Sequence, residues 1–171
     1  MDLLPAGPKL REGKKVTWPA SQFTMSLVGF EHVFTSAETV QFTPDLKLKV
    51  ISSTALMLLK IVAFMDDPQR RVKDLDDIRG LLSEYEADSE RLFSDIVLDA
   101  TLEDSGLAPA FLLGFDLRAL CTDEEVHIEA SMNEDKPAWM SFVRARSVGH
   151  HADEDARVQL AAFQQGFRHN V

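Results

Sequence analysis

The sequence predicts an α+β fold, in which a small antiparallel or mixed β portion is followed by a helical C-terminal half. Two observations lead to this prediction. Residues 1–51 contain short apolar segments separated by glycine, proline and charged residues, a pattern typical of strands and turns. From residue 52 onward, apolar residues recur at helical spacing. We therefore divide the chain into a β-rich part (1–51), a helix pair that packs on it (52–86) and a helical C-terminal region (87–171).

The elements expected in the first part are short. They are an apolar strand at Met1–Pro5, a loop or wide hairpin at 6–15, strands at 16–18 and 24–28, a helical turn at 30–34, and a hairpin with strands at 39–42 and 46–51. The hairpin encloses a turn at Thr43-Pro44-Asp45. In its second strand, apolar residues alternate with Lys47 and Lys49, which is typical of a half-buried or edge strand.

The helix pair places one cation inside an apolar segment. Lys60 is the only charged residue between Ala55 and Met65. A helix that is apolar on every side is usually buried on every side, so this ammonium either reaches an edge or meets an anion in a cleft. The helix can be capped by a hydroxyl at 52–54, and Asp66-Asp67-Pro68 ends it.

A second helix is expected from about Val72. Its apolar face is formed by Leu75, Ile78 and Leu82. Asp74 and Asp77 share another face, and Lys73 is expected to face Asp77, four residues further on.

The remaining segments are expected to be helical. A third helix, capped by Ser89, is expected to end before Gly106, and a fourth to run from Pro109 to Leu120. Thr122 and Glu125 are expected to form a capping box for a fifth helix. A sixth helix begins at Pro137, a loop covers 147–152, and a last helix covers 153–166.

Composition excludes several classes of protein. The 171 residues are 45% hydrophobic and 27% charged, as in ordinary globular domains. The net charge of −10 disfavours broad binding to nucleic acid, although a local contact through basic residues at 9–15 is compatible with it. No apolar run reaches the roughly 20 residues that span a bilayer, and no signal peptide is evident. We expect a cytoplasmic protein with no membrane partner.

Familiar chemical motifs are missing from the sequence. The histidines do not have metal-ligand spacing, the single Cys121 excludes an internal disulfide, and no nucleophile-elbow, P-loop or dinucleotide motif occurs. Asp66, Asp67, Asp74, Asp76 and Asp77 could offer oxygen ligands to a hard cation, but acidic clusters of this kind more often serve helix dipoles and solubility.

An ordered set of strings nevertheless suggests a family. They are M-D-L-L-P-A-G, T-W-P, M-S-L-V-G-F-E-H-V-F, and A-L-M-L-L-K-I-V-A-F with R-R-V-K-D-L-D-D-I-R-G-L-L. Together they resemble nucleotidyltransferases of the DNA polymerase β-like superfamily, especially the bacterial minimal, abortive-infection and toxin-type members. The resemblance covers about residues 1–85, and it implies that the β-rich part belongs to a nucleotidyltransferase palm.

The resemblance implies roles for particular residues. In the family, three aspartates hold a divalent metal, Mg²⁺, while a hydroxyl attacks the α-phosphorus of a nucleoside triphosphate. Asp2 matches the third aspartate and would be a catalytic and metal-binding residue. Lys60 would lie near the phosphates, and Lys73, Asp74 and Asp77 would order the cleft or contact the nucleotide. The implied partners are a nucleoside triphosphate and an RNA or protein acceptor.

The sequence departs from the family pattern at its start. The family's glycine-serine turn and paired aspartates would precede Asp2, and no Gly-Ser dipeptide occurs anywhere in the chain. With one carboxylate of three, we expect weak metal binding. We also expect a chain truncated at its N-terminus, or one that acts with another copy or a partner chain.

Three hypotheses follow. The chain is part of a nucleotidyltransferase, in which Asp2 and Lys60 face one cleft. Alternatively, it is a catalytically inactive binding or regulatory module of toxin–antitoxin or scaffold type, with an exposed apolar strip. In the third, it is a helical protein unrelated to nucleotides, and Lys60 points to solvent.

Overall fold

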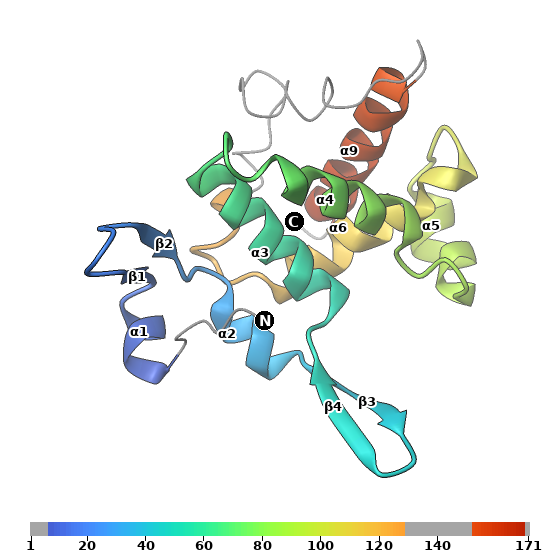
Figure 1. Cartoon of the computed structure of the whole chain (residues 1–171). Helices are drawn as coiled ribbons and strands as arrows, with labels where there is room; N and C mark the ends of the chain where they lie inside the picture. The colour runs from blue at the N-terminus through green and yellow to red at the C-terminus, as the bar shows by residue number, and fades with distance from the viewer. Residues whose placement is uncertain (1–6, 129–151, 170–171) are drawn as a thin grey trace.

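The computed structural model describes residues 7–128 and 152–169, and it confirms the α+β class. Four helices form the main hydrophobic core, and two small antiparallel sheets lie outside it (Figure 1). The core helices are α3 (Ser53–Asp66), α4 (Val72–Glu84), α6 (Ala108–Leu120) and α9 (Ala152–His169). No helix in the described ranges has the length and apolar content needed to cross a bilayer.

The first described elements form a small unit beside α3. They are α1 (Pro8–Glu12), β1 (Lys15–Thr17), β2 (Thr24–Ser26) and α2 (Phe30–Thr35). The strands expected at 16–18 and 24–28 are present as β1 and β2, which pair antiparallel, whereas part of the expected loop at 6–15 is the helix α1. The backbone N–H of Ser26 donates to Asp66 Oδ2 at 2.8 Å, so β2 is attached to the end of α3. The expected strand at Met1–Pro5 lies outside the described residues.

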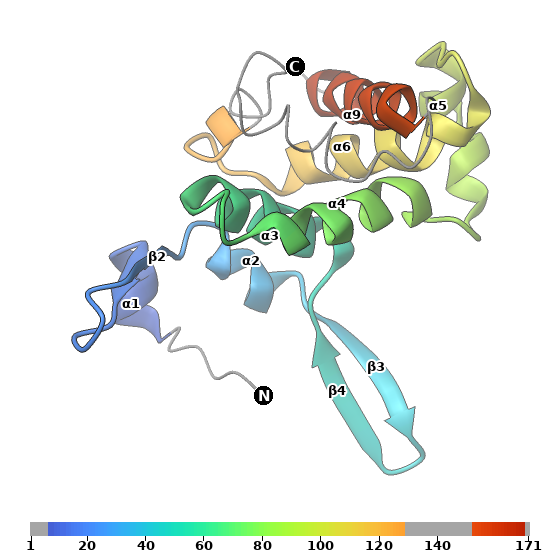
Figure 2. The same cartoon turned by 45° about the horizontal axis from the view of Figure 1, so that its top comes forward.

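The predicted hairpin is present but is not half-buried. Its strands are β3 (Glu38–Thr43) and β4 (Leu46–Val50), and it extends away from the helices in both views (Figures 1 and 2). All its large apolar side chains are exposed, with Phe42 at 69%. Of the two arrangements expected for the second strand, half-buried or edge, β4 is an edge strand, and its apolar face is exposed because nothing in the described chain covers it.

The helix pair matches the prediction closely. Ser52 caps α3 by accepting a hydrogen bond from the backbone N–H of Ala55 at 3.3 Å, and the helix ends at Asp66. α4 begins at Val72 and buries the predicted stripe, which is Leu75, Ile78 and Leu82.

The predicted third helix is wrong, because the chain forms two short pieces instead. These are a 3₁₀ helix, η1 (Glu90–Phe93), and α5 (Asp95–Asp99). Ser94 separates them in an extended conformation and serves as the N-cap of α5, a position that serine favours. A second 3₁₀ helix, η2 (Ser105–Leu107), leads into α6.

The C-terminal elements are described in part. The helix expected at 153–166 is present as α9, and Thr122 and Glu125 make the expected capping contact, in which the backbone N–H of Thr122 donates to Glu125 at 2.8 Å. The sixth helix and the loop expected at 147–152 fall almost wholly outside the described residues.

Two glycines allow α6 and α9 to pack closely (Figure 2). An ideal Cβ at Gly114 would lie 2.0 Å from the backbone oxygen of Phe163. An ideal Cβ at Gly166 would lie 1.9 Å from the backbone oxygen of Phe111. Since these atoms belong to helix backbones, they cannot move aside as a flexible side chain would.

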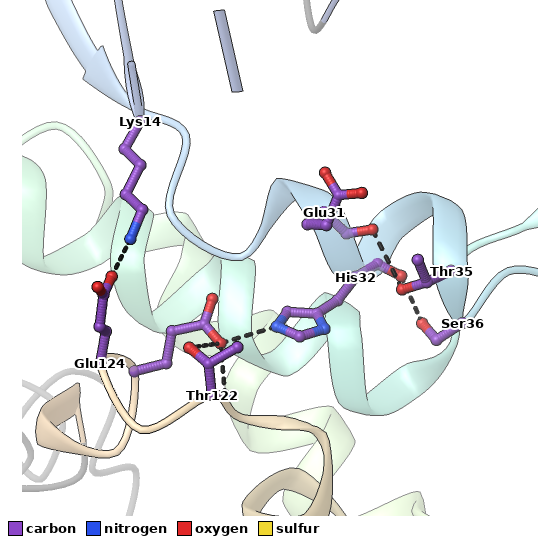
Figure 3. Close-up of polar contacts among 8 residues, drawn as sticks. Lys14, Glu31, His32, Thr35, Ser36, Thr122 and Glu124 are labelled. Carbon is purple, nitrogen blue, oxygen red and sulfur yellow. Dashed lines mark hydrogen bonds and ion pairs between the residues drawn. The ribbon is translucent and has the colours of Figure 1, made fainter. Parts of the chain in front are cut away.

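A buried polar contact joins α2 to the turn after α6 (Figure 3). His32 Nε2 lies 2.7 Å from Glu125 Oε2, and each side chain is 10% exposed. Burial alone would raise the pKa of Glu125, but hydrogen bonds from Thr122 and His32 outweigh it, so the pKa lies below its ordinary value. Nearby, Lys14 pairs with Glu124 at the surface.

We expect Gly114→Ala to destabilise the protein by at least about 2 kcal/mol, because the added methyl forces the α6 and α9 backbones apart. Urea denaturation followed by circular dichroism measures this change. Gly80→Ala, also in a helix interior, is the control, since a Cβ there meets nothing within 4 Å. Equal stability of Gly114→Ala and the parent protein would contradict the close packing.

We expect Glu125→Gln to reduce stability near neutral pH by about 1–3 kcal/mol, because a buried charge-assisted hydrogen bond is lost. The stabilisation from the Glu125 carboxylate is complete above its ordinary pKa of 4.5 and is lost as the pH falls through the lower folded-state pKa. The difference between parent and variant should therefore shrink in acid. Glu124→Gln, which alters the adjacent exposed residue, should show neither effect in urea denaturation between about pH 7 and pH 3.

Candidate functional site

Lys60 on α3 contacts two carboxylates of α4. Its ammonium donates to Asp74 Oδ1 at 2.8 Å and to Asp77 Oδ2 at 2.5 Å. The Asp74 side chain is 8% exposed and that of Asp77 is 52% exposed, so Asp74 is a fixed partner while Asp77 borders solvent. The lone cation of the apolar helix therefore meets anions, and it does not point freely to solvent.

Local helix geometry explains this arrangement. Asp74 and Asp77 are three residues apart and lie on one face of α4, as predicted. The expected pairing of Lys73 with Asp77 is wrong: Lys73 is exposed and makes no ion pair with the described side chains. An exposed ion pair within a helix contributes only about 0.2–0.5 kcal/mol to stability, whereas a partly buried ammonium without a counter-charge is costly. Asp77 therefore contacts Lys60.

Arg71 completes the charge balance of this cluster. Its Nη1 lies 3.7 Å from Asp74 Oδ2, a buried oxygen that accepts no hydrogen bond within the described chain. Lys60, Arg71, Asp74 and Asp77 together carry two positive and two negative charges. The cluster is therefore neutral overall.

The ammonium of Lys60 stays protonated near neutral pH. Burial alone lowers its pKa, but the hydrogen bonds that it donates to Asp74 and Asp77 outweigh burial and raise the pKa above its ordinary value of 10.5. Since Lys60 is charged when it is protonated, a raised pKa means that these ion pairs stabilise the fold below pH 10.5. This stabilisation is lost only as the pH rises above that value.

Lys60 borders two hollows. The larger is a groove of about 880 Å³ between the base of the hairpin, α3 and α4, and the smaller, of about 200 Å³, lies toward β2 and α2. In the larger groove, Lys60 and Asp77 form one charged end and Leu56, Gly80 and Leu81 form an apolar floor, while Glu84 and Glu86 add carboxylates beside Tyr85. A ligand with an anionic part and an apolar part would match this division.

A tyrosine near the far end of the groove is held by a contact that sequence reasoning missed. Tyr85 Oη donates to Asp116 Oδ2 at 2.6 Å, and Arg91 donates to both oxygens of Asp116 at 2.8 Å. Burial and the neighbouring Asp116 raise the pKa of Tyr85. Because Tyr85 and Asp116 are 31 positions apart in the sequence, no local pattern could reveal this contact.

The described residues do not by themselves fit a resident magnesium ion. No group of three or more His, Cys, Asp or Glu side chains within 7–128 and 152–169 could hold a metal. Asp74 and Asp77 already face the ammonium of Lys60, which would repel a cation. Asp2 lies outside the described residues, so its role as catalytic residue and metal ligand stays a prediction.

We expect Asp74→Asn to cost about 1–3 kcal/mol of stability, because the buried end of the Lys60 contact loses its charge. Asp77→Asn should change stability by less than about 1 kcal/mol, since that carboxylate borders solvent. The free energies of unfolding in urea measure both changes. Similar losses of stability in the two variants would contradict the assignment of Asp74 as the fixed partner of Lys60 and of Asp77 as the exchangeable one.

Comparison with known proteins bears on this site. The family model described as nucleotidyl transferase AbiEii toxin, type IV TA system, matches residues 12–167, which include both core helices that form the cluster. No curated protein and no solved structure matches the chain. Since the family model covers most of the sequence, the chain belongs to the AbiEii family of nucleotidyltransferase toxins.

Proposed function

We propose that the larger groove binds a nucleoside triphosphate, and that the chain acts in the transfer of a nucleotidyl group to a hydroxyl acceptor. Family membership supports this reaction class, and it excludes the hypothesis of a helical protein unrelated to nucleotidyltransferases. The observation that carries the proposal is the Lys60 ammonium, which a buried carboxylate holds in place at the charged end of the groove.

A phosphate oxygen would take the place of Asp77 at Lys60. Lysine binds phosphate as a compact point charge, and its direction here is already set by Asp74. Asp77 can leave at little cost because its carboxylate borders solvent. The ammonium of Lys60 would then face the ligand. Lys73, exposed on the first turn of α4, remains a predicted contact for the same nucleotide.

The charge of the groove constrains the form of the ligand. Five carboxylates line it against one ammonium: Glu38, Asp76, Asp77, Glu84 and Glu86. A free triphosphate would be repelled by this many acids, whereas its magnesium complex carries two fewer negative charges. We therefore expect the magnesium complex to be the ligand, with the metal entering as part of the substrate.

The proposed reaction breaks one bond of the triphosphate. A hydroxyl oxygen of the acceptor bonds to the α-phosphorus and gives its proton to solvent, the bond from that phosphorus to the bridging oxygen breaks, and pyrophosphate leaves. Lys60 would neutralise negative charge on the phosphates during this exchange. We expect the acceptor to be an RNA or a protein, and the toxin–antitoxin family implies an antitoxin as a further partner.

We expect Lys60→Met to weaken binding of magnesium-complexed ribonucleoside triphosphates by at least about tenfold, because the charged hydrogen bond to phosphate is lost. Asp77→Asn should tighten binding, since it removes the carboxylate that competes for Lys60. Isothermal titration calorimetry measures both affinities. The matched control is Lys49→Met on the hairpin, which changes the net charge equally but lies outside the groove.

The reaction itself is tested with triphosphates that carry an α-phosphate label. The full chain is incubated with magnesium and either total RNA or a protein extract, and label transfer is followed on gels. Transfer that depends on Lys60 supports the proposal. Tight binding of the triphosphate without transfer of the label to either acceptor would mean that the protein binds nucleotides but does not carry out the proposed reaction.

A further inference from the structure

Gly80, in the middle of α4, has no packing role within the described chain. A Cβ built at this position meets nothing within 4 Å, in contrast to Gly114 and Gly166. Glycine is less stable than alanine in a helix interior, because it loses more backbone freedom on folding. The fold alone therefore does not account for a glycine here.

The bare backbone of Gly80 faces the larger groove. Gly80 lies between Asp77, at the charged end, and Tyr85, and all three residues line the groove. With a rise of about 1.5 Å per residue, Gly80 is about 4.5 Å along the helix axis from Asp77, and Tyr85 is about 12 Å from Asp77. This span is comparable to the distance between the phosphates and the base of a nucleotide.

The surroundings of Gly80 combine apolar and acidic side chains. Leu56 from α3 and Leu81 from α4 line the groove with it, and so do Asp76, Asp77 and Glu84, which lie one turn away from Gly80 on the same helix. Tyr85 is fixed at the end of α4, because its hydroxyl donates to Asp116 and Asp116 is itself held by Arg91. A fixed aromatic side chain offers a contact to a planar ring at little entropic cost.

We propose that the nucleobase of the bound triphosphate lies on the backbone at Gly80, between Leu56 and Tyr85, and that a side chain at this position would exclude it. The proposal rests on the function proposed above, in which Lys60 binds the phosphates. It assigns Gly80 a role in binding and names the planar heteroaromatic base as the group that the apolar floor receives.

The test separates the base from the phosphates. Gly80→Ala is compared with the parent protein for binding of each of the four ribonucleoside triphosphates and of inorganic tripolyphosphate, all with magnesium. We expect the variant to unfold at a higher urea concentration. It should bind the nucleotides about tenfold more weakly, since one methyl group in a filled pocket has effects of this size. Its affinity for tripolyphosphate should be unchanged.

The matched control is Gly7→Ala, which makes the same substitution at an exposed glycine where a Cβ also meets nothing within 4 Å. Gly7 does not line the groove, so this variant should leave all affinities unchanged. Unchanged nucleotide affinity in Gly80→Ala, with loss of affinity in Lys60→Met, would overturn the base site and leave the proposed function standing. Failure of the parent protein to bind either nucleotide or tripolyphosphate would overturn both.

Discussion

The ammonium of Lys60 requires a counter-charge, and the contact that supplies it determines how the central helices α3 and α4 are arranged. The lysine projects from a helix that is otherwise apolar, and its side chain is only 26% exposed. A charge taken this far from water is costly unless it is paired. Asp74 supplies the buried partner, and the contact fixes α3 against α4. The same pairing leaves the ammonium at the edge of a groove, where it can meet a ligand.

Buried polar contacts recur wherever elements distant in the sequence meet. His32 with Glu125 joins α2 to the turn after α6, and Tyr85 with Asp116 joins the end of α4 to α6. Apolar burial supplies most of the favourable free energy of folding but is not directional, whereas hydrogen bonds specify which atoms face one another. Between α6 and α9 the orientation comes instead from two glycines, which let the helix backbones approach closely.

The antiparallel helices α3 and α4 supply the charged and apolar residues that line the larger groove. The short connection between α3 and α4 brings the middle of one helix beside the start of the other, so Lys60, the apolar floor and Tyr85 all line one groove. The hairpin stands beyond the groove with its apolar face exposed, and a two-stranded sheet without a packed face is only marginally stable in water.

Sequence by itself determined the local features of this protein. The ends of α3 and α4, the cap by Ser52 and the stripe along α4 follow from periodicity and end signals that act within a few residues. The unusual position of Lys60 and the family resemblance also came from the sequence, and the family match confirms that resemblance.

Only the tertiary structure decided the partners of these residues. Asp77 faces Lys60 and not Lys73, because a partly buried charge on another helix competes better than an exposed neighbour on its own helix. The contact of Asp116 with Tyr85 and the open space at Gly80 likewise depend on how separate elements meet. Such contacts leave no periodic trace in the sequence, because the distance between two residues along the chain does not fix their distance in space.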